Sequence, residues 1–103
     1  HAHGDNQVAW RGLLEQSETA PANLVLTHQT PSDIDGMYNP GGFTDGDRAV
    51  CIALAMGIAP DRIHLAGFRT DRIGRWTGST MPERKLRKLR WMATILDRLG
   101  VEW

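Results

Sequence analysis

The sequence predicts an α/β protein with a parallel sheet, in the order helix, strand, helix, strand, helix and a closing strand. Two short β-favouring segments, residues 23–28 and 62–68, alternate with segments of helical periodicity. This alternation is typical of parallel strands joined by right-handed helical crossovers. A chain of 103 residues suffices for one small domain, so we expect a single α/β domain over residues 1–103.

The first two predicted elements are a helix over residues 5–18 and a strand over residues 23–28. Asp5 is a good N-cap residue, apolar residues recur near one side of the helix, and Pro21 ends it. The strand sequence NLVLTH is short and apolar and lies between prolines, which favours a buried strand. The loop over residues 29–44 is long for a small domain, and such loops are frequently functional.

The second predicted helix covers residues 45–56 and is followed by the second strand, residues 62–68. The helix consists largely of alanine and other apolar residues, so we expect it to be buried. Gly57, with Pro60 beyond it, is a typical helix stop.

The last helix has the clearest start. Thr80, Pro82 and Glu83 predict a capping box with proline at the first helical position. Leucines then repeat every three or four residues up to Gly100, which places one apolar stripe on a core. The closing VEW predicts a final strand.

Composition limits the partners and the compartment. Lysine and arginine together number 12, as do aspartate and glutamate, so no net charge favours nucleic acid or an anionic membrane. The single cysteine, Cys51, lies in an apolar run and predicts a buried thiol in a reducing cytoplasm. No apolar run approaches the roughly 18 residues of a membrane span. We therefore expect no nucleic-acid partner, no membrane partner and a cytoplasmic location.

The motif GGFTDGDR places two carboxylates and an arginine among glycines, just before an apolar helix. Mg²⁺ in phosphate chemistry takes one or two carboxylates plus phosphate oxygens, which suits Asp45 and Asp47. A helix N-terminus with Arg48 suits an anion, and Gly42 and Thr44 would bring the backbone close to it. The alternative is structural, because Thr44 and Asp47 also have the spacing of an ordinary helix cap.

The first residues, HAHGDN, carry several side chains that can bind a metal or a polar ligand. His1, His3 and Asp5 alternate and would converge on one ion if they followed a strand, while Asn6 would contact a polar ligand edge. The alternative is that His1 is only a chain end and that Asp5 only caps its helix. A metal phosphohydrolase that uses His1 and His3 is a further hypothesis.

A third polar loop, GFRTDRIGRW, is rich in arginine. Arg69, Arg72 and Arg75 would clamp a polyphosphate, and Trp76 would offer an aromatic face to a flat ring. A solvated loop in which Asp71 pairs with these arginines is the alternative. In a parallel sheet, loops of this kind gather at the carboxyl ends of the strands, so we expect the three polar loops at one edge.

The basic run ERKLRKLR lies on the last predicted helix. Its leucines favour an amphipathic helix with a solvated charged face. A phosphate contact from Lys85 or Lys88 is the functional alternative, and nucleic-acid binding a third.

Together, HAHGDN, GGFTDGDRAV and KLRKLRWMATILDRLG resemble the archaeal 6-hydroxymethyl-7,8-dihydropterin pyrophosphokinase family. The resemblance covers nearly the whole chain but only the C-terminal half of that family's enzymes. It implies a three-layer Rossmann-like parallel sheet, similar to the catalytic domain of thiamine pyrophosphokinase and incomplete at its N-terminus. Residues 1–103 would then be the C-terminal part of a larger catalytic domain.

The resemblance also implies a reaction: Mg²⁺-dependent transfer of diphosphate from ATP to the hydroxymethyl group of a reduced pterin, releasing AMP, in folate or methanopterin biosynthesis. A homodimer is a further expectation. Related modules occur in flagellin-glycosylation proteins, so the alternative function is a non-catalytic α/β association module. The expected site comprises Asp45, Asp47 and Arg48 as catalytic residues, Asp5, Asp45 and Asp47 as metal ligands, and His3, Asn6, Gly42, Thr44, Arg69 and Lys85 as nucleotide- or pterin-binding residues.

Two departures from the family's pattern leave the acceptor open. The family is expected to carry an acidic motif at the end of an earlier strand, and these residues do not contain it. At the end of the segment 62–68, the family's pattern is glycine, an apolar or aromatic residue, then aspartate with phenylalanine, whereas this chain has Gly67, Phe68, Arg69 and Thr70, with Asp71 one place later. A different small alcohol or an altered diphosphate donor would fit this change.

Overall fold

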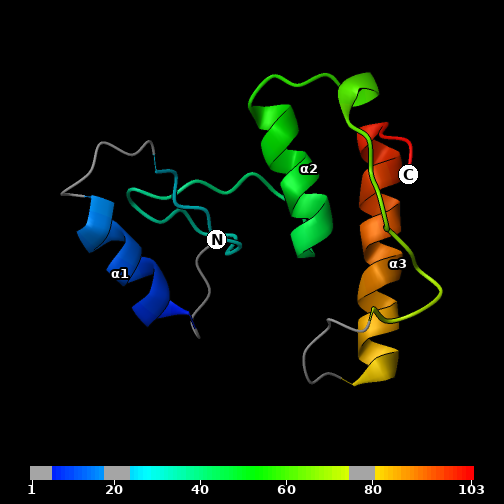
Figure 1. The fold of residues 1–103 in the computed structure, drawn as a ribbon, viewed down its shortest axis with the longest axis horizontal. Helices are drawn as coiled ribbons and strands as arrows, with labels where there is room; N and C mark the ends of the chain where they lie inside the picture. Colours follow the sequence, from blue (N-terminus) through cyan, green and yellow to red (C-terminus); the bar gives the residue numbers. More distant parts are fainter. Residues whose placement is uncertain (1–5, 18–23, 75–80) are drawn as a thin grey trace. The chain divides into compact units, whose positions relative to one another are not determined.

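The chain is helical in its computed structural model, which describes residues 6–17, 24–74 and 81–103 (Figure 1). The elements are α1 (Gln7–Ser17), α2 (Asp45–Ala55), the short 3₁₀ helix η1 (Pro60–Arg62) and α3 (Pro82–Leu99). The chain divides into two compact units, His1–Pro40 and Gly41–Trp103. No helix within the described ranges is long and apolar enough to cross a membrane.

The predicted α/β fold class is wrong, since no sheet forms among the described residues. The nearest approach to a strand pair is an isolated parallel bridge between Thr27 and Tyr38. In it, the Tyr38 N–H donates to the Leu26 carbonyl at 2.8 Å, and the His28 N–H donates to the Tyr38 carbonyl at 3.0 Å. One bridge at the predicted first strand is far from the three-layer Rossmann-like parallel sheet that the resemblance implied.

The second predicted strand, residues 62–68, shows why the sheet fails. The short helix η1 takes up its first residue, and Ile63 is extended, with φ −100° and ψ 116°. Extended backbone becomes a strand only when a neighbour pairs with its N–H and C=O groups, and none does so among the described residues. Ile63 and Leu65 instead pack against the helical core. The closing strand at residues 101–103 is likewise absent.

All three predicted helices are confirmed. In the unit His1–Pro40, α1 lies within the predicted range, and the Trp10 N–H donates to the Asn6 carbonyl at its first turn. The predicted cap, Asp5, lies outside the described residues. Val8 is 89 % exposed, so the apolar side of α1 is not buried as a whole.

Helices α2 and α3 both end in a Schellman motif. Gly57 and Gly100 adopt φ of +85° and +68°, a left-handed conformation that glycine adopts with little strain. After α3, the Gly100 N–H donates to the Asp97 carbonyl and the Val101 N–H to the Leu96 carbonyl. The predicted glycine stops are confirmed, whereas α3 begins with Pro82 after Met81 as N-cap, in place of the predicted Thr80.

Among the described residues, helix α3 supplies two of the four buried residues in the core cluster of the unit Gly41–Trp103. Val50 of α2, Met92 and Leu96 of α3, and Val101 are buried together, and Leu96 has no exposed surface. Leu89 and Leu99 pack against this cluster, as the leucine stripe predicted. The contact between α2 and α3 therefore fixes the N-terminal end of α2 beside the middle of α3 (Figure 1).

Candidate functional site

The Asp47 side chain is the centre of the loop that leads into α2. It is completely buried, and its carboxylate accepts the N–H groups of Phe43 at 2.5 Å and Thr44 at 2.7 Å, together with the Thr44 hydroxyl. Thr44 and Asp47 form a capping box at the start of α2. The structural alternative for this pair is therefore confirmed.

Arg48 holds the same loop from the other side. Arg48 is 3 % exposed, and its guanidinium donates to the carbonyl of Gly41 at 2.8 Å and to that of Gly42 at 3.0 Å. A Cβ at Gly42 would lie 2.6 Å from the Arg48 Cα, and its φ is +83°, so only glycine fits there. The protein's own backbone approaches Gly42 this closely, so packing explains the glycine at this position without any ligand.

The Cys51 thiol lies one turn further along α2 and is buried, as predicted. Burial raises its pKa, and the nearby Asp47 carboxylate raises it further, against a smaller opposing effect of Arg48. The thiol therefore stays protonated at neutral pH and serves as a small apolar group.

Asp45 is the exposed carboxylate of the motif. No group of three histidine, cysteine, aspartate or glutamate side chains that could hold a metal occurs in the part of the chain that the structure describes. A dedicated protein cage for a metal is therefore not formed there. One exposed carboxylate does suit Mg²⁺, which is frequently held by one or two protein carboxylates and the oxygens of a bound phosphate.

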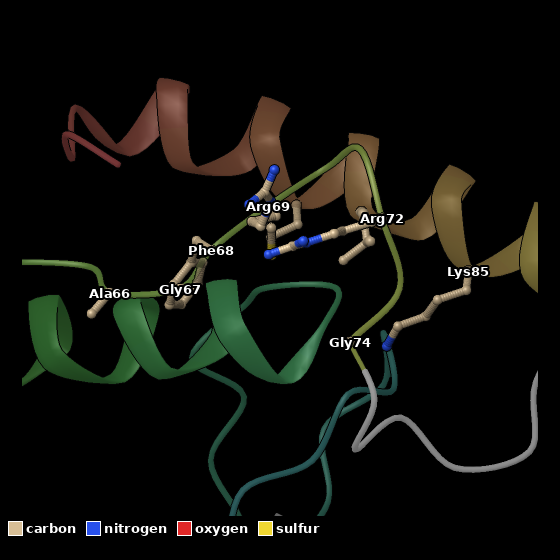
Figure 2. A pocket seen from close by; sticks show the side chains of 9 residues that line it. Ala66, Gly67, Phe68, Arg69, Arg72, Gly74 and Lys85 are labelled. Carbon is tan, nitrogen blue, oxygen red and sulfur yellow. The ribbon is translucent and has the colours of Figure 1, made fainter.

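A pocket of about 500 Å³ lies between the loop after residue 65 and helix α3, a size common for small-molecule sites (Figure 2). Three cationic side chains line it: Arg69, Arg72 and Lys85. Figure 2 shows the two arginines on the loop and Lys85 reaching from α3 toward Gly74. Two candidates separated by 16 positions in the sequence, Arg69 and Lys85, are thus brought together.

The apolar floor of the pocket was not predicted as part of a site. It consists of Phe68, Leu89 and Met92. Leu89 belongs to the predicted stripe, and Met92 three positions later continues it, so helical spacing alone could have found both. That the stripe borders a cationic pocket depends on where residues 66–74 cross α3, and no local pattern contains that information.

The floor also joins the pocket to the start of α2. A Cβ at Gly46 would lie 2.7 Å from Cε1 of the Phe68 ring and 3.4 Å from the Met92 sulfur. The ring therefore packs directly on the first turn of α2, one residue after Asp45. The start of α2 and the apolar floor of the pocket are therefore in contact at Gly46.

Arg69 forms an ion pair within its own loop. Its Nε donates to Oδ1 of Asp71 at 2.9 Å and its Nη2 to Oδ2 at 2.7 Å. The Arg69 hydrogen bonds, with a smaller effect of the Arg72 charge, lower the pKa of the Asp71 carboxyl to about 2, while the pair raises the pKa of Arg69. The predicted alternative of a self-paired, solvated loop is thus confirmed for this pair.

The remaining predicted residues divide into two groups. His1, His3, Asp5, Arg75 and Trp76 lie outside the described residues. Asn6 precedes α1 in the other unit, and Thr44 belongs to the cap. Lys88 lies with its Nζ 5.8 Å from the centre of the Phe43 ring, a cation–π contact beside the cap.

The chain is similar to two curated proteins that carry the same name, 6-hydroxymethyl-7,8-dihydropterin pyrophosphokinase. It is 37 % identical to the one from Pyrococcus furiosus over 106 residues, which cover 96 % of this chain and 42 % of the relative. It is 46 % identical to the one from Methanothermobacter thermautotrophicus over 69 residues, which cover 66 % of this chain and 26 % of the relative.

The chain thus spans less than half the length of the curated relatives it matches. No family model and no solved structure matches it. The resemblance predicted from the three motifs is nevertheless confirmed, because a similarity to these archaeal proteins extends over nearly the whole chain.

Proposed function

We propose that the protein carrying this chain, as a relative of the archaeal pterin pyrophosphokinases, transfers diphosphate from ATP to 6-hydroxymethyl-7,8-dihydropterin in folate or methanopterin biosynthesis. The observation that carries the proposal is the 37 % identity along 96 % of the chain. A cytoplasmic location and a homodimer, both expected from the sequence, belong to the same proposal.

The proposed reaction is a displacement at phosphorus. The hydroxymethyl oxygen of the pterin forms a bond to the β-phosphorus of ATP, the bond from that phosphorus to the oxygen bridging to the α-phosphorus breaks, and AMP leaves. The hydroxyl proton passes to solvent. Such a transfer asks the protein mainly to align the two oxygens and to offset the phosphate charge.

The cationic pocket is suited to the phosphate chain of ATP. Arg69, Arg72 and Lys85 line one hollow, and an arginine guanidinium can bind two phosphate oxygens at once. Binding and charge compensation are therefore the roles that we assign to these three residues.

Mg²⁺, when bound with the nucleotide, would offset charge on the phosphate oxygens as a Lewis acid. Asp45 is the residue that we assign to it, because its carboxylate is exposed and the next residue, Gly46, packs on the Phe68 ring of the pocket. The Asp47 carboxylate, in contrast, already accepts hydrogen bonds from Phe43 and Thr44. Asp5 remains a predicted second ligand.

The proposal is tested by AMP formation from ATP and 6-hydroxymethyl-7,8-dihydropterin, measured on the full-length protein across a Mg²⁺ titration. We expect Asp45→Asn to lower kcat/KM about 100-fold and to shift the Mg²⁺ midpoint upward, because a charged ligand of the metal is lost.

Asp61→Asn is the matched control, because Asp61 is also exposed but lies at a second hollow with Gly100 and Glu102. That hollow is roughly 20 Å along α3 from Lys85. Asp61→Asn should keep normal turnover. A wild-type protein that is folded but forms no AMP at any Mg²⁺ concentration would refute the enzyme and favour the association module.

A further inference from the structure

The ion pair of Arg69, one of the cations that line the pocket, has the geometry of a phosphate contact. Asp71 presents two oxygens to the Nε and Nη2 edge of Arg69, at 2.9 and 2.7 Å. This is the planar, two-bond arrangement in which a guanidinium binds either a carboxylate or a phosphate. A phosphate group that used the same edge of Arg69 would need the place that Asp71 holds.

Asp71 does not leave this place by protonation near neutral pH. Its pKa of about 2 keeps the carboxylate charged at every pH at which the protein would work. An incoming anion therefore has to compete with a charged aspartate. The result of that competition depends on how firmly Asp71 is held and on what else the incoming anion contacts.

Exposure makes the pair weak. The side chains of Arg69 and Asp71 are 47 % and 61 % exposed. Ion pairs in such surroundings contribute little, up to about a fivefold change in an equilibrium constant, because water screens both charges. Only one of the three cations lining the pocket is hydrogen-bonded to Asp71 among the bonds that the described residues show.

A chain of phosphates has an advantage that a single carboxylate lacks. Arg72 and Lys85 line the same hollow of about 500 Å³, so a di- or triphosphate in it can contact them while one of its phosphates binds Arg69. Several charge-assisted hydrogen bonds then replace one exposed pair. The balance favours the phosphate chain over Asp71.

We propose that Asp71 is an internal competitor: its carboxylate binds Arg69 in the ligand-free protein and is displaced by the phosphate chain of the nucleotide. This proposal deepens the function proposed above and rests on it for the identity of the ligand. Asp71 thereby lowers the affinity of the pocket for phosphate chains. Its effect passes mainly through Arg69, with a smaller part through the charge of Arg72.

The test measures binding of inorganic tripolyphosphate and of orthophosphate by isothermal titration calorimetry at constant ionic strength. The variants are Asp71→Asn, Arg69→Gln and the double variant. We expect tripolyphosphate to bind at least tenfold more tightly than orthophosphate, Asp71→Asn to tighten tripolyphosphate about two- to fivefold, and Arg69→Gln to weaken it about tenfold or more. In the Arg69→Gln background, Asp71→Asn should change binding much less, because only the weaker interaction of Asp71 with Arg72 is then removed.

Arg90→Gln is the matched control, since Arg90 is an exposed arginine on α3 about 140° around the helix axis from Lys85. It should leave tripolyphosphate binding unchanged. Circular dichroism of each variant confirms that it is folded.

Three outcomes would overturn the proposal. If Asp71→Asn tightens binding equally with and without Arg69, Asp71 acts as a distant charge. If Asp71→Asn weakens binding or leaves it unchanged, Asp71 either positions Arg69 or plays no part in binding. If the wild-type protein does not bind tripolyphosphate at all, the pocket is not a phosphate site. AMP formation, measured separately, distinguishes the two proposals: turnover without the Asp71 effect refutes the competitor alone, whereas the Asp71 effect without turnover refutes the enzyme alone.

Discussion

Two aspartates in one motif have opposite environments. Asp45 is exposed at the first position of α2, whereas Asp47, two positions later, is completely buried beneath the loop that it caps. A helix turns about 100° per residue, so two positions suffice to send one side chain to solvent and the other to the interior. Substitution of Asp45 should therefore affect activity, whereas substitution of Asp47 should affect stability.

Asp47→Asn should destabilise the unit Gly41–Trp103 by about 2–4 kcal/mol, because the amide nitrogen replaces one carboxylate oxygen and cannot accept the N–H of either Phe43 or Thr44 that this oxygen accepted. Urea unfolding of this variant beside Asp45→Asn measures the difference. Asp45→Asn should stay within about 0.5 kcal/mol of the wild type, as exposed substitutions generally do. Equal losses in the two variants would contradict the assignment of Asp47 to the cap.

At the scale of elements, the contact between α2 and the Phe68 ring of the pocket depends on glycine, which has no side chain, at position 46. Gly46 lies in the first turn of α2, where alanine would favour the helix by up to about 1 kcal/mol. Its Cα hydrogen faces the Phe68 ring, which leaves no room for a Cβ. Helix propensity and packing therefore oppose each other at this position.

We expect packing to prevail, so that Gly46→Ala lowers the free energy of unfolding by about 1–3 kcal/mol by displacing the Phe68 ring. Gly12→Ala in α1 is the control, because nothing lies within 4 Å of a Cβ built there. It should raise stability by up to about 1 kcal/mol. Thermal unfolding compares them, and Phe68→Leu added to Gly46→Ala should restore part of the loss. A stabilised Gly46→Ala protein would show that the ring moves without cost.

At the scale of the whole molecule, stability is unevenly spread between the two units. The buried apolar cluster lies in the unit Gly41–Trp103, around Leu96. In the unit His1–Pro40, the described residues show one helix and one isolated bridge, and the buried side chains Thr27 and His28 are polar. The His28 Nδ1 lies 2.9 Å from the Thr30 hydroxyl, so hydrogen bonding accompanies that burial.

Leu96→Ala should cost about 2–5 kcal/mol, because Leu96 is fully enclosed and a cavity would remain. Trp91→Ala on the same helix should cost much less, since Trp91 is 56 % exposed. Urea unfolding followed by far-ultraviolet circular dichroism reports both losses. If Trp91→Ala lowered the free energy of unfolding as much as Leu96→Ala, Trp91 would have to be buried in a core, which contradicts its exposed position in this structure.

The sequence determined the helices of this protein almost by itself. Periodic apolar residues, Pro82 at a helix start, and Gly57 and Gly100 at helix ends specify structure through bonds between residues three to five positions apart. The cap at Thr44 and Asp47 is equally local, and so is the Arg69–Asp71 pair, two positions apart. Each of these was foreseen as one interpretation of a short motif.

Tertiary structure decided what those local patterns could not. A sheet requires distant segments to pair, and β-favouring residues 62–68 cannot specify a partner, so they pack on the helices as unpaired chain. Burial separates Asp47 from Asp45, and the crossing of one loop over α3 brings Lys85 to Arg69 and Arg72. Local hydrogen bonds are specified by residues that are close in the sequence, whereas strand pairing, burial and the convergence of charges depend on contacts between residues far apart in the chain.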